Sequence, residues 1–353
     1  MGGAAWWRVC RVVAVVAALA AGSSAAAPER PGPQAAWRGD PRPPADVPEG
    51  IQTTGRRSSW RAQRRAARRG RSVAPVDEPT VAELPEPTPP PATAVVHLVH
   101  RDQPYAVEGH PRQRFDIHLP TGCGGGLPLV VWIHGDDWRS GSKADCPITW
   151  LVDRGYAVAS VGHRLSSDAA FPAQLDDVRA GLGAILRDAE LWGVDPQRVC
   201  VAGFGSGGQL AALLAMVDHP ADEADPPTAA LVAIAAPSLL TALEPRHDRA
   251  AAAAAQLVGG PLPEFRETAQ RASPVVHASA DDPPTLLLHG RRDADVPPEQ
   301  ARRLEAALRA AGVECRLELV DAAHAVPLAA ESTAGRTLAT FLERAIGPGT
   351  TAP

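Results

Sequence analysis

A glycine-rich stretch, residues 203–208 with the sequence Gly-Phe-Gly-Ser-Gly-Gly, is the first feature with the pattern of a chemical site. It follows a short β-branched strand and precedes a helix rich in alanine and leucine. A strand, a tight turn and a helix in this order form a nucleophile elbow, in which a serine stands at the tip as Gly-x-Ser-x-Gly. Here Gly205 stands at the tip, between Gly203 and Gly207, and Ser206 follows one position later. The sequence therefore predicts the backbone turn that normally presents a catalytic serine, but the residue at its tip, Gly205, has no side chain.

Two residues near the end of the chain fit the roles of groups that activate a nucleophile. Asp293 follows the apolar run Thr285–His289, and His324 follows the run Arg316–Val320. In nucleophilic catalysis a histidine takes the proton of the nucleophile, and a carboxylate orients that histidine. Asp293 and His324 fit these two roles, with Asp295 as the alternative acid. The other interpretation is that these residues belong to surface loops and have no chemical role.

A loop that follows a buried apolar strand, His134-Gly135-Asp136-Asp137, is the candidate for oxyanion stabilisation. Glycines in such a loop let the backbone approach a ligand and adopt positive φ angles. Asp tolerates that backbone better than most residues, but a carboxylate about 5 Å from an oxyanion opposes it by roughly 3 kcal/mol at an effective dielectric near 20. An outward-pointing carboxylate would be harmless. A metal or water-activating site combining this loop with His324 is disfavoured, because adjacent carboxylates diverge, so neither metal nor cofactor is expected.

The elements that must position these residues alternate between short apolar strands and amphipathic helices. Helices are predicted over Gln174–Leu191, Ser206–Met216 and Pro298–Ala311, the last one ending before a glycine. The predicted strands are Val95–Val99, Arg114–Leu119, Leu129–Ile133, Ala157–Val161, Val199–Ala202, Ala230–Ala235, Thr285–His289 and Arg316–Val320. This alternation indicates one α/β domain with a doubly wound, mostly parallel sheet of about eight strands. The first two strands lack an intervening helix and are expected to pair antiparallel at one edge. Loops after the strands gather at the carboxyl edge, where ligands bind in such sheets.

Several motifs agree in order and spacing with one known group of proteins. Ordered along the chain, they are His134–Trp138, Trp138–Lys143, His163–Leu165, Phe171–Gln174, Leu257–Pro261, and His289–Pro297 with the final His324. Residues 94–346 thereby resemble the α/β-hydrolase fold, in the esterase/lipase branch that includes feruloyl-esterase-like and hormone-sensitive-lipase-like carboxylesterases. The order of nucleophile, acid and histidine is the order of that fold. The resemblance favours Asp293 over Asp295 as the acid.

The same resemblance places Gly205 at the nucleophile position and the two glycines of the family's oxyanion loop at Asp136 and Asp137. In one serine protease, loss of the nucleophile costs on the order of a million-fold in turnover. Ser206 lies one residue into the helix, where a single step rotates the side chain by about 100°. It is interpreted as a helix cap or a small filler. The chain is therefore expected to be an esterase-like protein without serine-hydrolase activity, whose pocket binds an ester, a glycan ester or a partner. The alternative is an active carboxylic-ester hydrolase that uses Ser206 or an activated water with Asp293 and His324.

The ends of the chain differ in composition from the predicted domain. Residues 1–27 have a basic start, an apolar run and small residues, the pattern of a secretory signal peptide. They predict a secreted or periplasmic protein, with an uncleaved membrane anchor as the alternative. Residues 28–93 are rich in proline and are predicted to be a disordered linker. Residues 347–353 are predicted to be a disordered tail. Arg56–Arg71 contains eight arginines in sixteen residues, so it could contact anionic surfaces. The folded domain is expected over residues 94–346.

Charge and cysteine content narrow the class further. The formal net charge of −5 argues against a nucleic-acid-binding protein. Cys200 and Cys315 lie in apolar runs and are expected to be buried thiols, whereas Cys123 and Cys146 lie in loop-like segments. An exported protein could join the latter two in a disulfide, and the spacing leaves that open. Residues 237–282 are rich in alanine and are interpreted as a lid or cap.

Overall fold

The computed structural model describes residues 97–123, 125–217, 228–243 and 248–347. The predicted signal peptide, the linker with Arg56–Arg71, and residues 348–353 of the predicted tail lie outside the described residues. So do the first three residues of the predicted domain. Within the described ranges, no helix combines the length and the apolar character that a membrane span requires.

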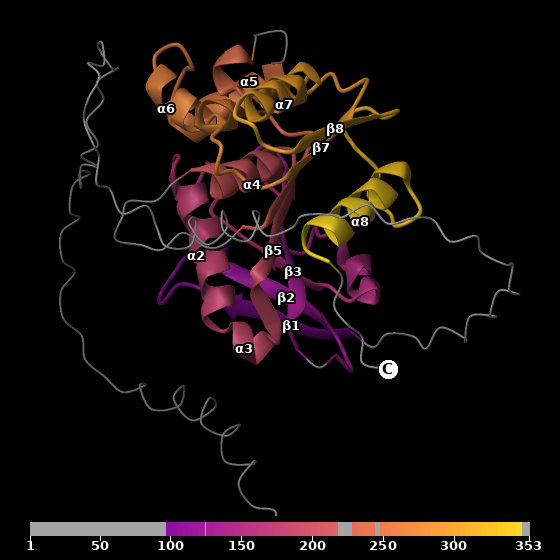
Figure 1. Ribbon diagram of the computed structural model, residues 1–353. Helices are drawn as coiled ribbons and strands as arrows, with labels where there is room; N and C mark the ends of the chain where they lie inside the picture. The colour runs from indigo at the N-terminus through magenta and orange to yellow at the C-terminus, as the bar shows by residue number, and fades with distance from the viewer. Residues whose placement is uncertain (1–96, 124, 218–227, 244–247, 348–353) are drawn as a thin grey trace, which may run out of the picture. The chain divides into compact units, whose positions relative to one another are not determined.

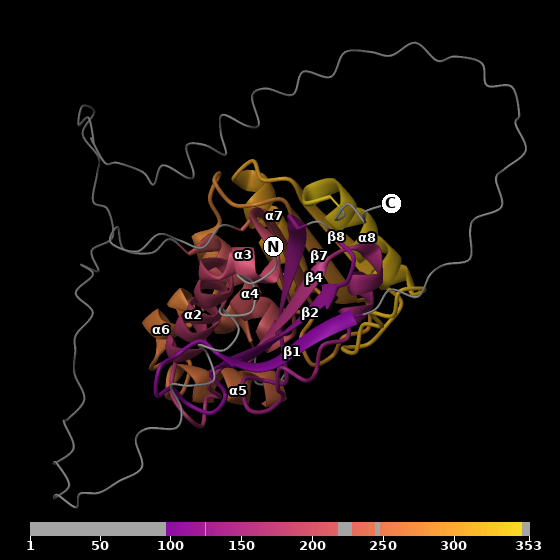
Figure 2. The ribbon, with the colours of Figure 1, turned by 90° about the horizontal axis from the view of Figure 1, so that it is seen from below.

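An eight-stranded sheet forms the centre of the domain (Figure 1). Its strands follow the order β1-β2-β4-β3-β5-β6-β7-β8. Their bounds are β1 His97–Pro104, β2 Arg114–Pro120, β3 Leu127–Ile133, β4 Ala157–Val161, β5 Val194–Phe204, β6 Ala230–Ile234, β7 Thr285–Gly290 and β8 Cys315–Val320. β1 pairs antiparallel with β2, and β2 pairs antiparallel with β4, while the other neighbours are parallel. All eight predicted strands are present, and the antiparallel edge is confirmed where β1 lies beside β2 (Figure 2). The first strand overlaps its predicted range only over residues 97–99 and continues to Pro104, while residues 95–96 lie outside the described residues.

The helices cover both faces of this sheet. Those in the described residues, apart from short 3₁₀ turns, are α2 Ala173–Arg187, α3 Ala189–Trp192, α4 Ser206–Met216, α5 Asp248–Val258, α6 Arg266–Arg271, α7 Glu299–Ala310 and α8 Thr333–Ala345. Successive residues of β3 show why two layers form: Val131 packs in one buried cluster with α2 and α4, and Val130 packs in the other with α8. Side chains alternate across a strand, so a strand that is apolar throughout requires cover on both faces.

The predicted helices are confirmed with small corrections. α4 has the predicted bounds, and α7 is shorter than the predicted helix by one residue at each end. The helix predicted over Gln174–Leu191 divides at Asp188 into α2 and α3. The segment interpreted as a cap contains α5 and α6, and α8 is a helix that the sequence analysis did not predict.

The cysteines are all free thiols within the described residues. Cys200 and Cys315 are buried as predicted. Cys123 and Cys146 do not form the disulfide that the sequence left open. The fold is therefore held by its packed sheet and helices, without a covalent cross-link in the described part.

The sheet brings the chemically interesting loops to one edge. β3 and β5 are parallel neighbours with Ile133 opposite Gly203, so the loop after β3 lies beside the glycine turn after β5. β7 and β8 are likewise parallel neighbours with Gly290 opposite Val320. Both pairs run in the same direction, and the loops after them line one cavity.

Candidate active site

The turn between β5 and α4 has the tight geometry of a nucleophile elbow. Gly205 has φ 54° and ψ −121°, a conformation that side-chain-bearing residues rarely adopt. A Cβ atom on Gly203 would lie 2.3 Å from the carbonyl oxygen of Gly207, and a Cβ atom on Gly207 would lie 2.1 Å from that of Ile133. The two flanking glycines are therefore needed for strand, turn and helix to pack this closely. The scaffold of the elbow is intact.

The tip of the elbow faces His324. A Cβ atom built on Gly205 would lie 3.6 Å from Nε2 of His324, and among the described residues the other atom within 4 Å of it is Cε1 of the same ring. A serine at this position would direct its hydroxyl group toward the histidine without displacing a neighbour. This geometry supports the register in which Gly205 occupies the nucleophile position.

Ser206 points elsewhere. Its side chain is buried, and Oγ accepts a hydrogen bond of 3.1 Å from the backbone N–H of Trp138. It forms no capping hydrogen bond at the start of α4, so the interpretation as a helix cap is wrong. The indole N–H of Trp138 donates a 3.1 Å hydrogen bond to Oε1 of Gln209, one turn further along α4. Ser206 and Gln209 together attach the loop after β3 to the helix, a role that sequence reasoning missed.

Asp293 and His324 form a hydrogen-bonded pair. Oδ2 of Asp293 lies 2.8 Å from Nδ1 of His324 and 3.2 Å from Nε2 of His289. The other carboxylate oxygen accepts backbone hydrogen bonds of 3.0 Å and 2.9 Å from Asp295 and Val296. The Asp295 side chain is exposed, so the geometry selects Asp293 as the partner of the histidine. Sequence reasoning missed His289, although it lies four residues before the acid.

The two members of the pair shift each other's pKa values in opposite directions. Burial alone would raise the pKa of Asp293, but hydrogen bonds from His289, His324 and the backbone lower it well below its usual range. Burial alone would lower the pKa of His324, but its hydrogen bond to Asp293 and the negative charges of Asp293 and Asp295 raise it. The carboxylate therefore stays ionised and favours the charged form of the imidazole.

The loop after β3 keeps a left-handed backbone without glycines at its centre. The φ angles of Asp136, Asp137 and Trp138 are 81°, 59° and 59°. Gly135 has no such angle, but a Cβ atom there would lie 2.4 Å from the carbonyl oxygen of Phe204. The loop therefore follows a path suited to glycine, with two carboxylates added at the cavity.

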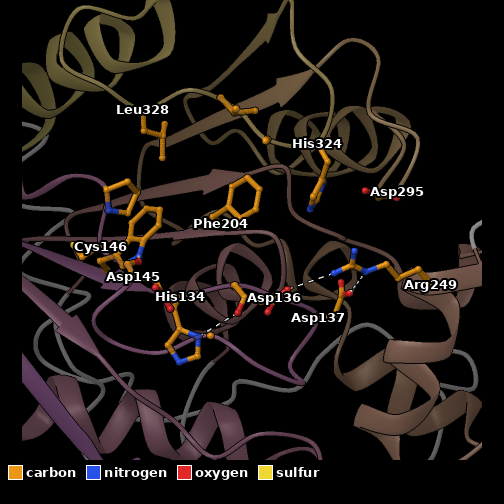
Figure 3. A pocket seen from close by; sticks show the side chains of 16 residues that line it. His134, Asp136, Asp137, Asp145, Cys146, Phe204, Arg249, Asp295, His324 and Leu328 are labelled. Carbon is orange, nitrogen blue, oxygen red and sulfur yellow. Dashed lines mark hydrogen bonds and ion pairs between the residues drawn. The ribbon is translucent and has the colours of Figure 1, made fainter.

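Both carboxylates contact one guanidinium group from the cap. Nε of Arg249, on α5, lies 2.5 Å from Oδ2 of Asp137, and its Nη2 lies 3.4 Å from Oδ1 of Asp136 (Figure 3). Asp136 also accepts a hydrogen bond from the Ser140 hydroxyl. The expectation that adjacent carboxylates diverge concerned a shared metal ion or water, whereas the long, planar guanidinium spans both groups. Arg249 partly neutralises their charge, and nothing in its local sequence signals this contact.

His134 lies beneath the loop rather than in contact with the elbow tip. It is buried, its Nδ1 lies 3.1 Å from the carbonyl oxygen of Gly135, and its ring stacks on that of His163 with centroids 4.2 Å apart. Burial and the neighbouring histidine lower the pKa of His134 to about 3. Among the described residues, the side chains close enough to share a metal ion are Asp293, Asp295 and His324. The site that would combine His134, Asp136 and Asp137 with His324 is therefore not assembled.

A cavity of about 690 Å³ lies between these loops (Figure 3). Its walls include the oxyanion loop, Arg249, Asp295 and His324, and on the other side Trp132, Phe204, Val326 and Leu328. The ring of Phe204 lies 5.0 Å from that of His324, centroid to centroid. The cavity has the size and mixed lining of a small-molecule site.

Comparison with known proteins bears on the family and the fold. Residues 115–308 match the family model BD-FAE. The esterase LipC of Mycobacterium tuberculosis is 28% identical over 302 residues, which cover 79% of this chain and 74% of the relative. The probable carboxylic ester hydrolase LipM of the same organism is 28% identical over 60% of this chain, and the chain spans about half of its length (52%).

The fold is also shared with solved structures. A truncated carbohydrate esterase from gut microbiota has a TM-score of 0.63 and 23% sequence identity, over 70% of this chain and 95% of that protein. The comparisons confirm the α/β-hydrolase fold and the esterase/lipase branch that the motifs predict. The protein is a carboxylesterase-type α/β-hydrolase in fold and ancestry.

Proposed function

Because the chain belongs to the BD-FAE family, we propose that it is an exported carboxylesterase-type protein whose serine-hydrolase activity is lost or much reduced. The observation that carries the proposal is the vacant tip of the elbow, where Gly205 faces His324 without a side chain. The proposal of export rests on the signal-like sequence of residues 1–27, which lie outside the described residues. In place of cleavage, the cavity would hold a small ligand, such as an ester or a glycan ester.

The changed oxyanion loop supports the loss of activity. Preorganised backbone donors stabilise the negative charge that develops on an ester oxygen. Asp136 and Asp137 place carboxylates beside the path of those donors, and their two contacts with the one guanidinium of Arg249 offset part of this charge. Nucleophile and oxyanion loop depart from the family pattern together, so two independent contributions to hydrolysis are weakened.

The second candidate function is a hydrolase that uses Ser206 or an activated water. The observation in its favour is the intact hydrogen bond between Asp293 and His324. Against Ser206 stands its hydrogen bond with Trp138, which directs the hydroxyl group toward the loop after β3. A water beside His324 would lack the covalent intermediate that divides ester hydrolysis into two easier steps.

Covalent capture by a fluorophosphonate probe separates these functions. We expect the unchanged protein and the Ser206→Ala variant to remain unlabelled, and the Gly205→Ser variant to be labelled at residue 205. A Gly205→Ser, His324→Ala double variant should lose that labelling, because the serine then lacks its base. Labelling of the unchanged protein that disappears in Ser206→Ala would contradict the proposal.

A further inference from the structure

The cavity beside His324 has one acidic end and one apolar end. Asp136, Asp137 and Asp295 line the acidic end, where Figure 3 shows Arg249 between the loops. Aromatic and aliphatic side chains, namely Trp132, Phe204, Val326 and Leu328, line most of the other end, where the exposed Asp145 also lies. A ligand that fills this cavity must place a polar head among carboxylates and an apolar body along the opposite wall.

The carboxylates at the acidic end outnumber the cations that pair with them. Arg249 is the one arginine or lysine among the described residues that line the cavity, and the other basic group there, His324, is paired with Asp293. It contacts Asp136 and Asp137, which leaves a net charge of −1 for that group, and no cation in the described part of the chain forms an ion pair with Asp295. The guanidinium is about two-thirds exposed (64%), so it can exchange its partners for water or for another cation.

This charge is unsuited to an anionic ligand or to the oxyanion that forms during ester hydrolysis. A carboxylate or a developing oxyanion at this end would face three carboxylates at short range. A protonated amine or guanidinium would be attracted by them, in the way that Arg249 already is within the chain. The adjacent aromatic ring of Phe204 also suits a cationic head, since the face of an aromatic ring attracts cations.

We propose that the cavity binds an organic cation, with its charged head beside Asp137 and Asp295 and its apolar body along Phe204 and Leu328. The inference rests on the proposed function, because a site without a nucleophile at residue 205 retains its ligand instead of cleaving it. The bound head competes with Arg249 for the carboxylates. The site is thus a former oxyanion-binding region that has become selective for the opposite charge.

Isothermal titration calorimetry with three probes of one carbon skeleton tests the selectivity. The probes are 4-phenylbutylamine, 4-phenylbutanol and 4-phenylbutyrate, which present a cationic, a neutral and an anionic head at neutral pH. We expect the full chain to bind the amine about tenfold more tightly than the alcohol, from two carboxylate contacts of an exposed type. The carboxylate probe should bind more weakly than the alcohol. High salt should weaken amine binding and leave alcohol binding unchanged.

Variants locate the binding at this site. Asp137→Asn and Asp295→Asn should each weaken amine binding about threefold without changing alcohol binding. Asp321→Asn is the matched control, because it removes an exposed carboxylate outside this cavity, one that pairs with Arg292. Arg249→Ala should tighten amine binding, because it removes the competing cation, a result that general damage to the protein would not produce.

Three results would overturn the inference: tighter binding of 4-phenylbutyrate than of the amine, amine binding unchanged by both Asn variants, or no amine binding at millimolar concentration. Calorimetry involves no ester, so these results are independent of the labelling experiment. A chain that binds the amine but is labelled at Ser206 would refute the proposed function and keep the cation site. A chain that is not labelled by the probe and does not bind the amine would support the proposed function and refute the cation site.

Discussion

The acid–histidine pair and the oxyanion loop face the same cavity, but the protein holds them in different ways. Asp293 is fully enclosed and accepts hydrogen bonds from the His324 imidazole and two backbone N–H groups, with Nε2 of His289 3.2 Å from the same carboxylate. Asp136 and Asp137 are partly exposed and share one exposed cation, Arg249. Loss of Asp293 would leave several buried donors without a partner. The pair is therefore part of the fold as well as of the site, and its presence alone is no evidence of catalysis.

The elbow also combines positions that the fold requires with one position that it does not. Gly203 and Gly207 cannot be replaced without steric conflict, whereas the position of Gly205 has open space beside His324. Structural demands preserve the turn, and chemistry alone would demand a serine at its tip. If the activity is lost as proposed, Asp293 and the flanking glycines remain because the fold needs them, whereas only chemistry requires a side chain at residue 205.

The largest expected effect is restoration of the nucleophile. We expect Gly205→Ser to raise turnover of a short p-nitrophenyl ester by at least about a hundredfold, since removal of such a nucleophile costs on the order of a million-fold elsewhere. The backbone at residue 205 has a strained φ, which a serine tolerates at a cost of about 1–3 kcal/mol. Adding Asp136→Gly and Asp137→Gly should raise the rate by about another tenfold, through the oxyanion loop. An unchanged rate in both variants would mean that the scaffold has lost more than these residues.

The structural role of the acid predicts a loss of stability. Asp293→Ala should lower the free energy of unfolding by about 3 kcal/mol, because it leaves His324 and the backbone N–H groups of Asp295 and Val296 without their buried acceptor. Asp295→Ala is the matched control, since its side chain is exposed, and should change stability by about 0.5 kcal/mol or less. Urea denaturation measures both. Equal effects of the two substitutions would show that Asp293 is not structurally embedded.

The stacked histidines predict a dependence of stability on pH. Burial lowers the pKa of His134 to about 3 and also lowers that of His163, from an ordinary value of 6.5. The unfolded chain takes up these protons below pH 6.5 and the folded chain does not, so stability falls as the pH falls below 6.5. Each group contributes about 1.4 kcal/mol per pH unit there. The raised pKa of His324 acts in the opposite sense, since its stabilising contribution is full below pH 6.5 and is lost at higher pH.

Substitution isolates the contribution of one stacked ring. His163→Phe keeps a planar ring in place and should reduce the slope of stability between pH 6 and 5 by about one proton. Tyr156→Phe, which removes a buried hydroxyl group and no histidine, is the control and should leave the slope unchanged. If the free energy of unfolding of both variants depends on pH as it does in the unchanged protein, the two stacked histidines are not neutral in the fold as assigned.

The smallest expected effect concerns Ser206. Replacement by alanine removes the acceptor for the backbone N–H of Trp138 and should lower the free energy of unfolding by about 1 kcal/mol. Thermal unfolding measures this loss, and the rate of ester turnover should not change. A large loss of turnover with unchanged stability would assign Ser206 to catalysis instead.

The fold was largely predictable because its central strands are buried on both faces. Continuous apolar runs such as Leu129–Ile133 mark such strands, and the glycines around Gly205 mark the start of α4. The start of β5 at Val194 was missed, because Asp195 and Pro196 interrupt the apolar pattern. α5 was not predicted as a helix, since an alanine-rich segment carries little of the periodicity on which such predictions depend.

The site was predictable where order along the chain determines position. Parallel strands bring the loops after β3, β5, β7 and β8 to one edge, so Asp293 and His324 could be placed near Gly205 from sequence. The contacts of Arg249 with the oxyanion loop and of Ser206 with Trp138 join segments that are distant in sequence. They depend on side-chain directions within the folded chain, which spacing alone does not determine.

The most direct test of the central claim compares ester turnover of the unchanged protein with that of its His324→Ala variant. Both alternatives to a lost activity, through Ser206 or through a water, require this histidine as the base. We predict equal rates, close to that of the buffer alone, for the two proteins with a short p-nitrophenyl ester. A rate in the unchanged protein that falls tenfold or more in His324→Ala would show that the site still hydrolyses esters.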